Sequence, residues 1–334
     1  MSFVRYNPED SVISSETVVR GLFTGDSYTL SSFATSSNPT EYYVDVWNGD
    51  PTNSGSSVQF SIQYGNINGS GSALINTAVP NFTPSRVVYG EYRNLVFGTE
   101  TQNFSFDNGT TIASDIFVLN FARARYKESL LPGSFNLTLK SGSRAIQLTD
   151  DSGTTNLTRF IGENEVYYII SGSNGNAYTA NASASYYGMM FPDLDIVVLN
   201  ATASTVVDLR NYFAPITYAT SSAQNNQLKL YTSIVSGSTS YASSSMTLKS
   251  SETVSSRYFF TRVKNSEFNY TTNPSIIDAN GNLLYTTLIN NPQTFITSVG
   301  MYNDNNELLA VAKLSQPLTK DFTKEALIRI KLDY

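Results

Sequence analysis

Short runs of alternating apolar and polar residues, separated by clusters of turn-forming residues, recur along the 334-residue chain. The clearest example is residues 293–314, where two such runs flank the pentapeptide NDNNE at residues 303–307. A period of two is typical of a half-buried strand, and the short side chains of Asn and Asp bond to their own backbone and favour tight turns. We therefore expect a β-hairpin over residues 293–314. A chain built from such units is constrained to a mainly β fold.

The same pattern predicts further elements. Alternating runs indicate strands at residues 41–47, 57–64, 115–124, 134–140 and 326–332. Residues 165–171 and 195–200 are almost continuously apolar, which is typical of central strands. Residues 84–97 favour a helix instead, because apolar side chains recur at helical spacing between a Thr-Pro start signal and Gly98. A second short helix is expected over residues 205–213.

These elements predict a mainly β fold with two or three β-sandwich-like domains and one or two short helices. Apolar residues become fewer, and Ser, Gly and Thr more frequent, in residues 141–255. We therefore expect an N-terminal β domain over residues 1–140 and a Ser/Gly/Thr-rich middle β domain over residues 141–255. A C-terminal docking domain, which contains the hairpin, is expected over residues 256–334.

Composition excludes several function classes. The sequence has no cysteine and no histidine, so a disulfide, a thiolate nucleophile, a Cys/His zinc site and an imidazole base are ruled out. The net charge of −6 argues against a phosphate-binding face, which needs clustered Lys and Arg, so no nucleic-acid partner is expected. The N-terminus does not resemble a secretory signal, and no apolar run approaches the roughly 20 residues of a membrane span, so no membrane insertion is expected.

Paired carboxylates are the remaining route to catalysis. Three pairs lie close in sequence: Glu163 with Glu165, Asp193 with Asp195, and Asp150 with Asp151. On a strand, residues two apart share a face about 7 Å apart, which is a separation that a glycosidase can use. The simpler interpretation is that they are carboxylates at turns and strand ends, since Gly162 and Pro192 adjoin two of the pairs. We therefore predict no catalytic residues and no enzyme activity.

Two loops superficially resemble ligand sites. The NDNNE loop lacks the Gly at the sixth position and the Glu at the twelfth that a calcium loop requires. The sequence GNINGSG at residues 65–71 is not followed by the Lys-Ser/Thr pair and helix of a phosphate loop. Both are interpreted as turns, and neither a metal nor a cofactor is expected.

The C-terminal region also resembles a known family. Its sequence QTFITSVGMYNDNNELLAVAKL at residues 293–314 is similar to the hairpin of baseplate-associated structural and fibre-attachment proteins of contractile-tailed phages. Residues 257–274, 290–292 and 324–332 look like the corresponding parts of tail proteins in T-even-type phages. The resemblance is strongest over residues 257–332, and weaker similarity covers residues 2–8 and 189–200.

This resemblance implies a virion structural protein, a tail or baseplate component that assembles with other tail proteins and with copies of itself in a symmetric assembly. It implies location in the phage tail after assembly in the bacterial host cytoplasm, and it supplies no catalytic or ligand residues. In fibre proteins with this hairpin the attachment unit is usually N-terminal, so its C-terminal place here argues against a receptor-binding role. Two alternatives stay open: a tail-borne adhesin or depolymerase for host-surface glycans, and a neck, collar or head–tail connector component.

The hairpin is the candidate docking surface, because one of its faces can pack on its own domain while the other must find cover. The residues expected in the interface are Phe295, Val299, Met301, Leu309 and Val311. Leu309 and Val311 are expected to differ, one of them facing the core of the domain and the other facing a partner.

A second candidate is the basic run FARARYK at residues 121–127. On a strand, Arg123, Arg125 and Lys127 would share one face. That face either meets an acidic partner subunit or is solvated, and Arg123 and Arg125 are included among the interface candidates.

Overall fold

The structure is a computed structural model of the chain, and it describes residues 6–36, 43–69, 84–106, 112–154, 158–178, 187–201, 225–238, 246–270 and 273–333. The chain forms two compact units. We call Val18–Glu252 the large unit, and Met1–Thr17 together with Thr253–Tyr334 the small unit. Strand makes up 49% and helix 13% of the fold, so the predicted mainly β class is confirmed.

The large unit contains fourteen whole strands among its described residues. They are β2 (Thr29–Leu30), β3 (Ala34–Ser36), β4 (Tyr43–Trp47), β5 (Val58–Asn66), β6 (Asp115–Asn120), β7 (Ser129–Leu130), β8 (Asn136–Ser141), β9 (Arg144–Asp150), β10 (Arg159–Ile161), β11 (Asn164–Ser173), β12 (Asn176–Ala177), β13 (Gly188–Phe191), β14 (Ile196–Asn200) and β15 (Met246–Thr247). Its helices are α1 (Ser85–Phe97), the short 3-10 helix η2 (Arg123–Arg125) and α2 (Asn225–Ser238).

All but β7 of these strands belong to one antiparallel sheet, in the order β2-β15-β8-β9-β11-β13-β14-β6-β5-β4-β3, with β10 and β12 paired to β11. The strands near the middle of this order are covered on both faces. In β14 every residue is buried, as the nearly continuous apolar sequence predicted. Alternate residues of β6 supply two separate cores: Ile116 and Val118 pack in one, and Phe117 and Leu119 in the other.

Helix α1 covers the first of these cores. Its buried side chains Val88, Tyr89, Tyr92 and Val96 recur at helical spacing and pack with Ile116 and Val118 of β6. The helix ends at Gly98, whose φ of 65° is the left-handed conformation that glycine adopts readily. The predicted helix over residues 84–97 is therefore confirmed.

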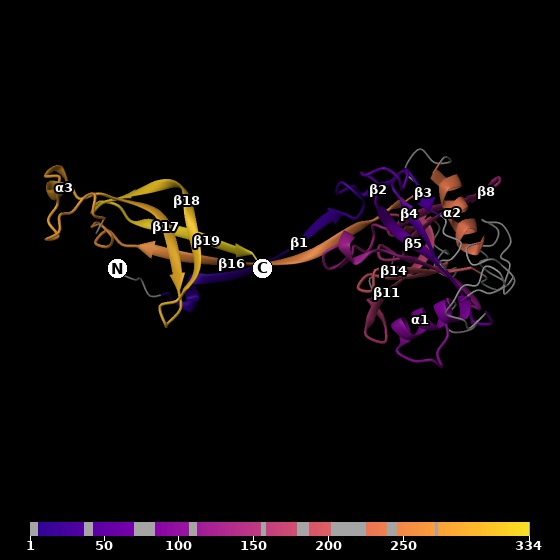
Figure 1. Cartoon of the computed structure of the whole chain (residues 1–334). Helices are drawn as coiled ribbons and strands as arrows, with labels where there is room; N and C mark the ends of the chain where they lie inside the picture. Colours follow the sequence, from indigo (N-terminus) through magenta and orange to yellow (C-terminus); the bar gives the residue numbers. More distant parts are fainter. Residues whose placement is uncertain are drawn as a thin grey trace. The chain divides into compact units, whose positions relative to one another are not determined.

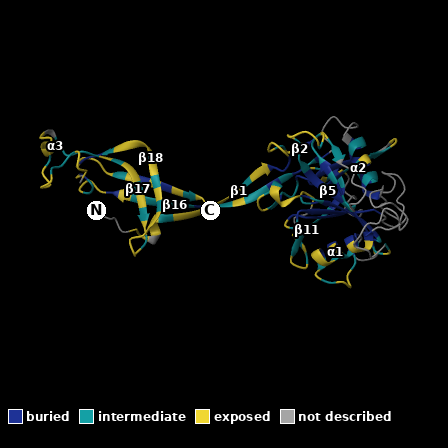
Figure 2. Ribbon diagram, viewed as in Figure 1, coloured by how far each residue is buried: buried dark blue, intermediate teal, exposed yellow. Residues whose placement is uncertain are grey.

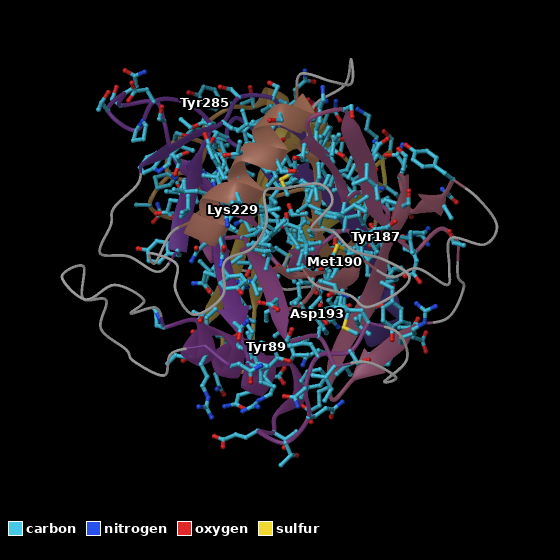
Figure 3. All side chains as sticks on the ribbon, turned by 90° about the vertical axis from the view of Figure 1, so that its right-hand side faces the viewer. Tyr89, Tyr187, Met190, Asp193, Lys229 and Tyr285 are labelled. Carbon is cyan, nitrogen blue, oxygen red and sulfur yellow. The ribbon has the colours of Figure 1, made fainter. Side chains whose placement is uncertain are left out.

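Helix α2 covers the second core and was not predicted. It packs on β8, and Leu230 and Ile234 are its buried apolar residues in that core; Figure 3 shows this helix, with Lys229 labelled, lying across strands of the large unit. A side chain at Gly237 would collide with the backbone of Thr138, so the helix approaches the strand too closely for a larger residue. The Ser233 hydroxyl also accepts a hydrogen bond from the backbone of Lys140, at 3.1 Å.

The small unit is built around a second sheet, ordered β1-β16-β19, with β7 also paired to β16. Its elements are η1 (Pro8–Asp10), β1 (Ser11–Gly21), β16 (Lys249–Val263), α3 (Thr287–Asn290), β17 (Thr294–Tyr302), β18 (Leu308–Lys320) and β19 (Ala326–Asp333). Both β1 and β16 extend past the boundary of the unit. The last strand, β19, pairs with β16 from Ser256↔Asp333 to Val263↔Ala326, as expected for a strand at the C-terminus.

The structure differs from the sequence-based organisation in three ways. The boundary expected at residues 140/141 falls inside the hairpin of β8 and β9, so residues 1–140 and 141–255 do not form separate compact units. The described residues hold three α-helices rather than one or two, because α2 and α3 were missed. The strand expected over residues 115–124 ends at Asn120. The helix expected over residues 205–213 lies outside the described residues.

Candidate functional site: the outer face of the C-terminal hairpin

Strands β17 and β18 form a two-stranded antiparallel sheet closed by the NDNNE turn. The turn is held by its own side chain: Asn303 Oδ1 accepts hydrogen bonds from the backbone N–H of Asn305 at 3.0 Å and of Glu307 at 2.8 Å. Asn306 has a φ of 62°, which Asn tolerates better than most residues. The Asn303 side chain therefore closes the turn from within, and the predicted hairpin turn is confirmed.

One face of the hairpin packs on the small unit. Its residues Ile296, Val299, Met301, Ala312 and Leu314 contact a core formed by Phe259, Val263, Ile328 and Ile330 of β16 and β19. Figure 1 shows the hairpin beside these two strands. We call the face that carries Ile296, Val299, Met301, Ala312 and Leu314 the inner face. It gives the small unit a core of four buried side chains surrounded by partly buried ones.

The opposite, outer face carries large apolar side chains that remain exposed. The exposed fractions are 62% for Phe295, 42% for Tyr302, 53% for Leu308, 67% for Leu309 and 61% for Val311. Figure 2 shows exposed residues along both strands of the hairpin, in contrast to the buried strands of the large unit. With ~150–200 Å² for each fully exposed side chain of this size, the outer face offers roughly 500 Å² of apolar surface. Patches of this size on a monomer are often functional.

Gly300 lies beside Tyr302, Leu308 and Val311 of this face. It pairs with Val311 in the middle of the hairpin. A Cβ atom at Gly300 would lie 2.9 Å from the ring of Tyr302 and 3.3 Å from a methyl group of Leu308. The Tyr302 ring therefore lies close to the glycine, with a methyl group of Leu308 beside it.

A register shift decides which residues reach the outer face. The pairing of β17 with β18 is irregular between Ile296 and Ser298, and again between Met301 and Tyr302. An extra residue in one strand reverses the alternation of its side chains. Phe295 and Val299 would share a face in a regular strand, but here Phe295 is exposed and Val299 packs on the core.

The predicted interface set is therefore divided between the two faces. Phe295, Leu309 and Val311 lie on the outer face, whereas Val299 and Met301 belong to the inner face and are corrected to core contacts. The expected difference between Leu309 and Val311 is wrong, because residues two apart in a strand share a face and both are exposed. Tyr302 and Leu308 belong to the outer face although the prediction omitted them. The signal for Tyr302 was its place two residues after Gly300, on the same face of the strand.

A buried lysine anchors the end of the hairpin. Lys320 is fully buried, and its ammonium donates to the backbone oxygens of Asn265 at 3.0 Å and Asp321 at 2.9 Å and to Asn269 Oδ1 at 2.8 Å. A buried cation is costly unless its donors are satisfied, and here three acceptors satisfy all three N–H groups. Lys320 therefore ties β18 to the loop that follows β16, which holds the hairpin in place.

The basic run at residues 121–127 does not form the expected strand face. Arg123 and Arg125 lie in η2. Arg125 donates to the Val58 carbonyl, to Thr24 Oγ1 at 3.1 Å and to Ser57 Oγ at 2.7 Å, so its guanidinium connects segments of the large unit. Arg123 lies over the ring of Tyr126, 4.7 Å from its centroid. The prediction of a strand with a shared basic face is therefore wrong, and Arg125 is a structural residue.

The Asp193/Asp195 pair occupies a turn, not a strand. Asp193 is exposed, whereas Asp195 is 2% exposed and has a φ of 58°. Burial raises the pKa of Asp195 to about 6, opposed by a hydrogen bond from Tyr126 and by the charge of Arg123. Its Oδ1 atom is buried and accepts no hydrogen bond from the described residues. One buried and one exposed carboxylate do not face each other across a cleft, so the geometry of a glycosidase is not formed.

The other two carboxylate pairs also have structural roles. Glu163 lies in the turn between β10 and β11, and Glu165 accepts a hydrogen bond from the Tyr167 hydroxyl at 2.6 Å. Asp151 forms an ion pair with Arg159, with 2.6 Å between nitrogen and oxygen.

The neighbouring Asp150 accepts the backbone N–H of Gly133 at 2.8 Å, and burial raises the pKa of its carboxyl. Both carboxylates of this pair therefore bind donors of the protein itself. No group of three or more acidic side chains that could hold a metal ion occurs in the described part of the chain.

A scan of protein-family models and searches of curated proteins and of solved structures found no match to the chain. Among the helices that the structure describes, none is long and apolar enough to cross a membrane.

Proposed function

We propose that the protein is a structural component of a contractile-tailed phage, located in the tail or baseplate, which joins its neighbours through the outer face of the β17–β18 hairpin. The observation that carries this proposal is the exposed layer of Phe295, Leu308, Leu309 and Val311 on a hairpin whose inner face is already packed. Apolar patches of this size are often functional on monomers. The resemblance of residues 257–332 to tail proteins supplies the biological setting.

The composition of the outer face supports a role in assembly. Permanent interfaces are apolar at their centres and polar at their rims. Residues 308–312 carry no charged side chain, and Lys313 is the first charged residue after them. The turn that precedes them carries Asp304 and Glu307.

A catalytic role has no comparable support. Asp150, Asp151, Asp195 and Glu165 each bind neighbouring groups of the protein or are buried in a turn. The adhesin and the neck or connector alternatives gain no specific observation, and neither is proposed.

The test is direct localisation. An antibody against the protein, coupled to gold, should label the tail or baseplate of intact contractile-tailed particles, and mass spectrometry should find the chain in purified tails. Labelling of the head or neck, or absence of the chain from purified particles, would contradict the proposal. Tight binding of the isolated protein to host cells would favour the adhesin alternative instead.

A further inference from the structure

We infer that the partner of the outer face is the same face of a second copy of this chain, so that the protein forms a two-fold symmetric dimer through its hairpins. This inference rests on the proposed docking role of the hairpin. It adds the identity of the partner, which the docking role leaves open.

The first argument is the size of the surface. A standard interface buries about 800 Å² on each partner, of which somewhat more than half is apolar. The outer face offers roughly 500 Å² of apolar surface by the areas that large side chains bury. Two copies placed face to face therefore supply the apolar centre of one standard interface, without any contribution from the large unit.

The second argument is charge. The small unit has nine Lys and Arg residues against ten Asp and Glu, whereas the large unit has twelve against seventeen. Two small units can thus approach with little net repulsion, while two large units would repel each other more strongly. The small unit also neutralises charges internally, for example between Arg262 and Glu325 at 2.6 Å and between Lys331 and Asp333 at 3.0 Å.

The third argument is complementarity along the hairpin. In the two-fold arrangement that sets the hairpins in opposite directions, Lys313 of one copy approaches the turn of the other, which carries Asp304 and Glu307. Opposite charges then lie on either side of the apolar segment that contains Leu309 and Val311. A self-complementary arrangement of this kind is what an interface between identical copies requires.

The oligomeric state of the full chain tests this inference first. The full chain should sediment with twice the 36.7 kDa mass of the monomer at micromolar concentration. Leu309→Asp should raise the dissociation constant of the dimer at least about tenfold, because it places a charge at the apolar centre. The matched control is Leu327→Asp: Leu327 is 69% exposed but lies on β19, away from the hairpin, and this variant should remain a dimer.

A second measurement locates the contact. The chain has no cysteine of its own, so one introduced cysteine is the only site for a thiol cross-linker. Val311→Cys should form covalent dimers with a short bismaleimide, whereas Leu327→Cys should not. Two outcomes would overturn the inference: a wild-type protein that stays monomeric, or a Leu309→Asp variant that dimerises as well as the wild type. If the wild type is monomeric while Leu309→Asp is still excluded from particles, the proposed docking function stands and only the second copy as its partner is wrong.

Discussion

The two units differ in how far they bury strands of similar apolar sequence. In the large unit, β14 has five apolar or amide side chains in succession, and all are buried between two cores. In the small unit, β18 begins with the equally apolar LLAVA, yet Leu308, Leu309 and Val311 remain exposed. The large unit covers its strands with its own helices and neighbouring strands, whereas the small unit leaves one sheet face uncovered. A continuous apolar run therefore indicates a strand that needs cover on both sides, but it does not say whether that cover comes from the same chain.

The most direct contrast is between one aromatic ring in each unit. Phe117 of β6 is fully buried beside Leu199 of β14 and Tyr64 of β5, and Phe117→Ala should reduce the free energy of unfolding of the large unit by about 3–5 kcal/mol because it leaves a cavity. Phe295→Ala should change the free energy of unfolding of the monomer by less than about 0.5 kcal/mol, because the ring is already in water. Urea denaturation of both variants measures the difference, and equal losses would show that the two units do not differ as described.

The lysine at the end of the hairpin tests whether the small unit has a stability of its own. Lys320→Met removes three hydrogen bonds of an ammonium, two of them buried (to Asn269 Oδ1 and to the Asp321 carbonyl), so the small unit should lose about 3 kcal/mol. Hydrogen exchange should show faster exchange in β18 and β19 with little change in β6 and β14. Lys324→Met is the control, since Lys324 is exposed and only pairs with Asp321. Unchanged exchange in β18 would contradict the anchoring role.

The buried carboxyl of Asp195 predicts a pH dependence confined to the large unit. Its pKa in the folded protein is about 6, above its ordinary value, so folding favours the protonated form and the stabilising contribution is lost as pH rises through 6. Asp195→Asn should therefore raise the free energy of unfolding of the large unit by about 2 kcal/mol at pH 8, with the gain disappearing towards pH 4. Asn also tolerates the positive φ of this position.

Asp193→Asn is the matched control and should have little effect, because Asp193 is exposed. Thermal unfolding at a series of pH values measures both variants. A gain from Asp195→Asn that does not depend on pH would show that the charge is not the cause.

The smallest effect is expected at Glu163, in the exposed turn between β10 and β11. Glu163→Gln should leave the free energy of unfolding within about 0.5 kcal/mol of the wild type and should leave particle infectivity unchanged. Loss of a saccharide-cleaving activity in this variant would overturn the prediction that the protein is not an enzyme.

Much of the fold could be predicted where the pattern of apolar residues is strong. Helix α1 and strand β19 were found because their buried residues follow one clear period, and β14 was found because its sequence is almost continuously apolar. Helix α2 was missed because its buried face includes the polar residues Asn226, Gln227 and Ser233, which do not produce an apolar stripe. The pairing of β1 with β16 joins residues far apart in sequence, and no local pattern predicts such a contact.

The candidate site was predicted in part for a related reason. The sequence located the hairpin, its turn and its surplus of apolar side chains, and Leu309 and Val311 do lie on the exposed face. It misplaced Val299 and Met301 relative to Phe295, because the irregular pairing after Ile296 changes the face and alternation alone cannot show where a strand gains a residue.

Competitive incorporation into particles tests the assembly role of the outer face most directly. Cells that produce contractile-tailed particles would be supplied with equal amounts of wild-type protein and the Leu309→Asp variant, and mass spectrometry would measure their ratio in purified particles. Leu327→Asp serves as the control, and circular dichroism confirms that all three proteins fold. If the outer face is the assembly surface, particles contain wild type and Leu327→Asp in the proportions supplied and exclude Leu309→Asp. Incorporation of folded Leu309→Asp at the same proportion as the wild type would contradict the account.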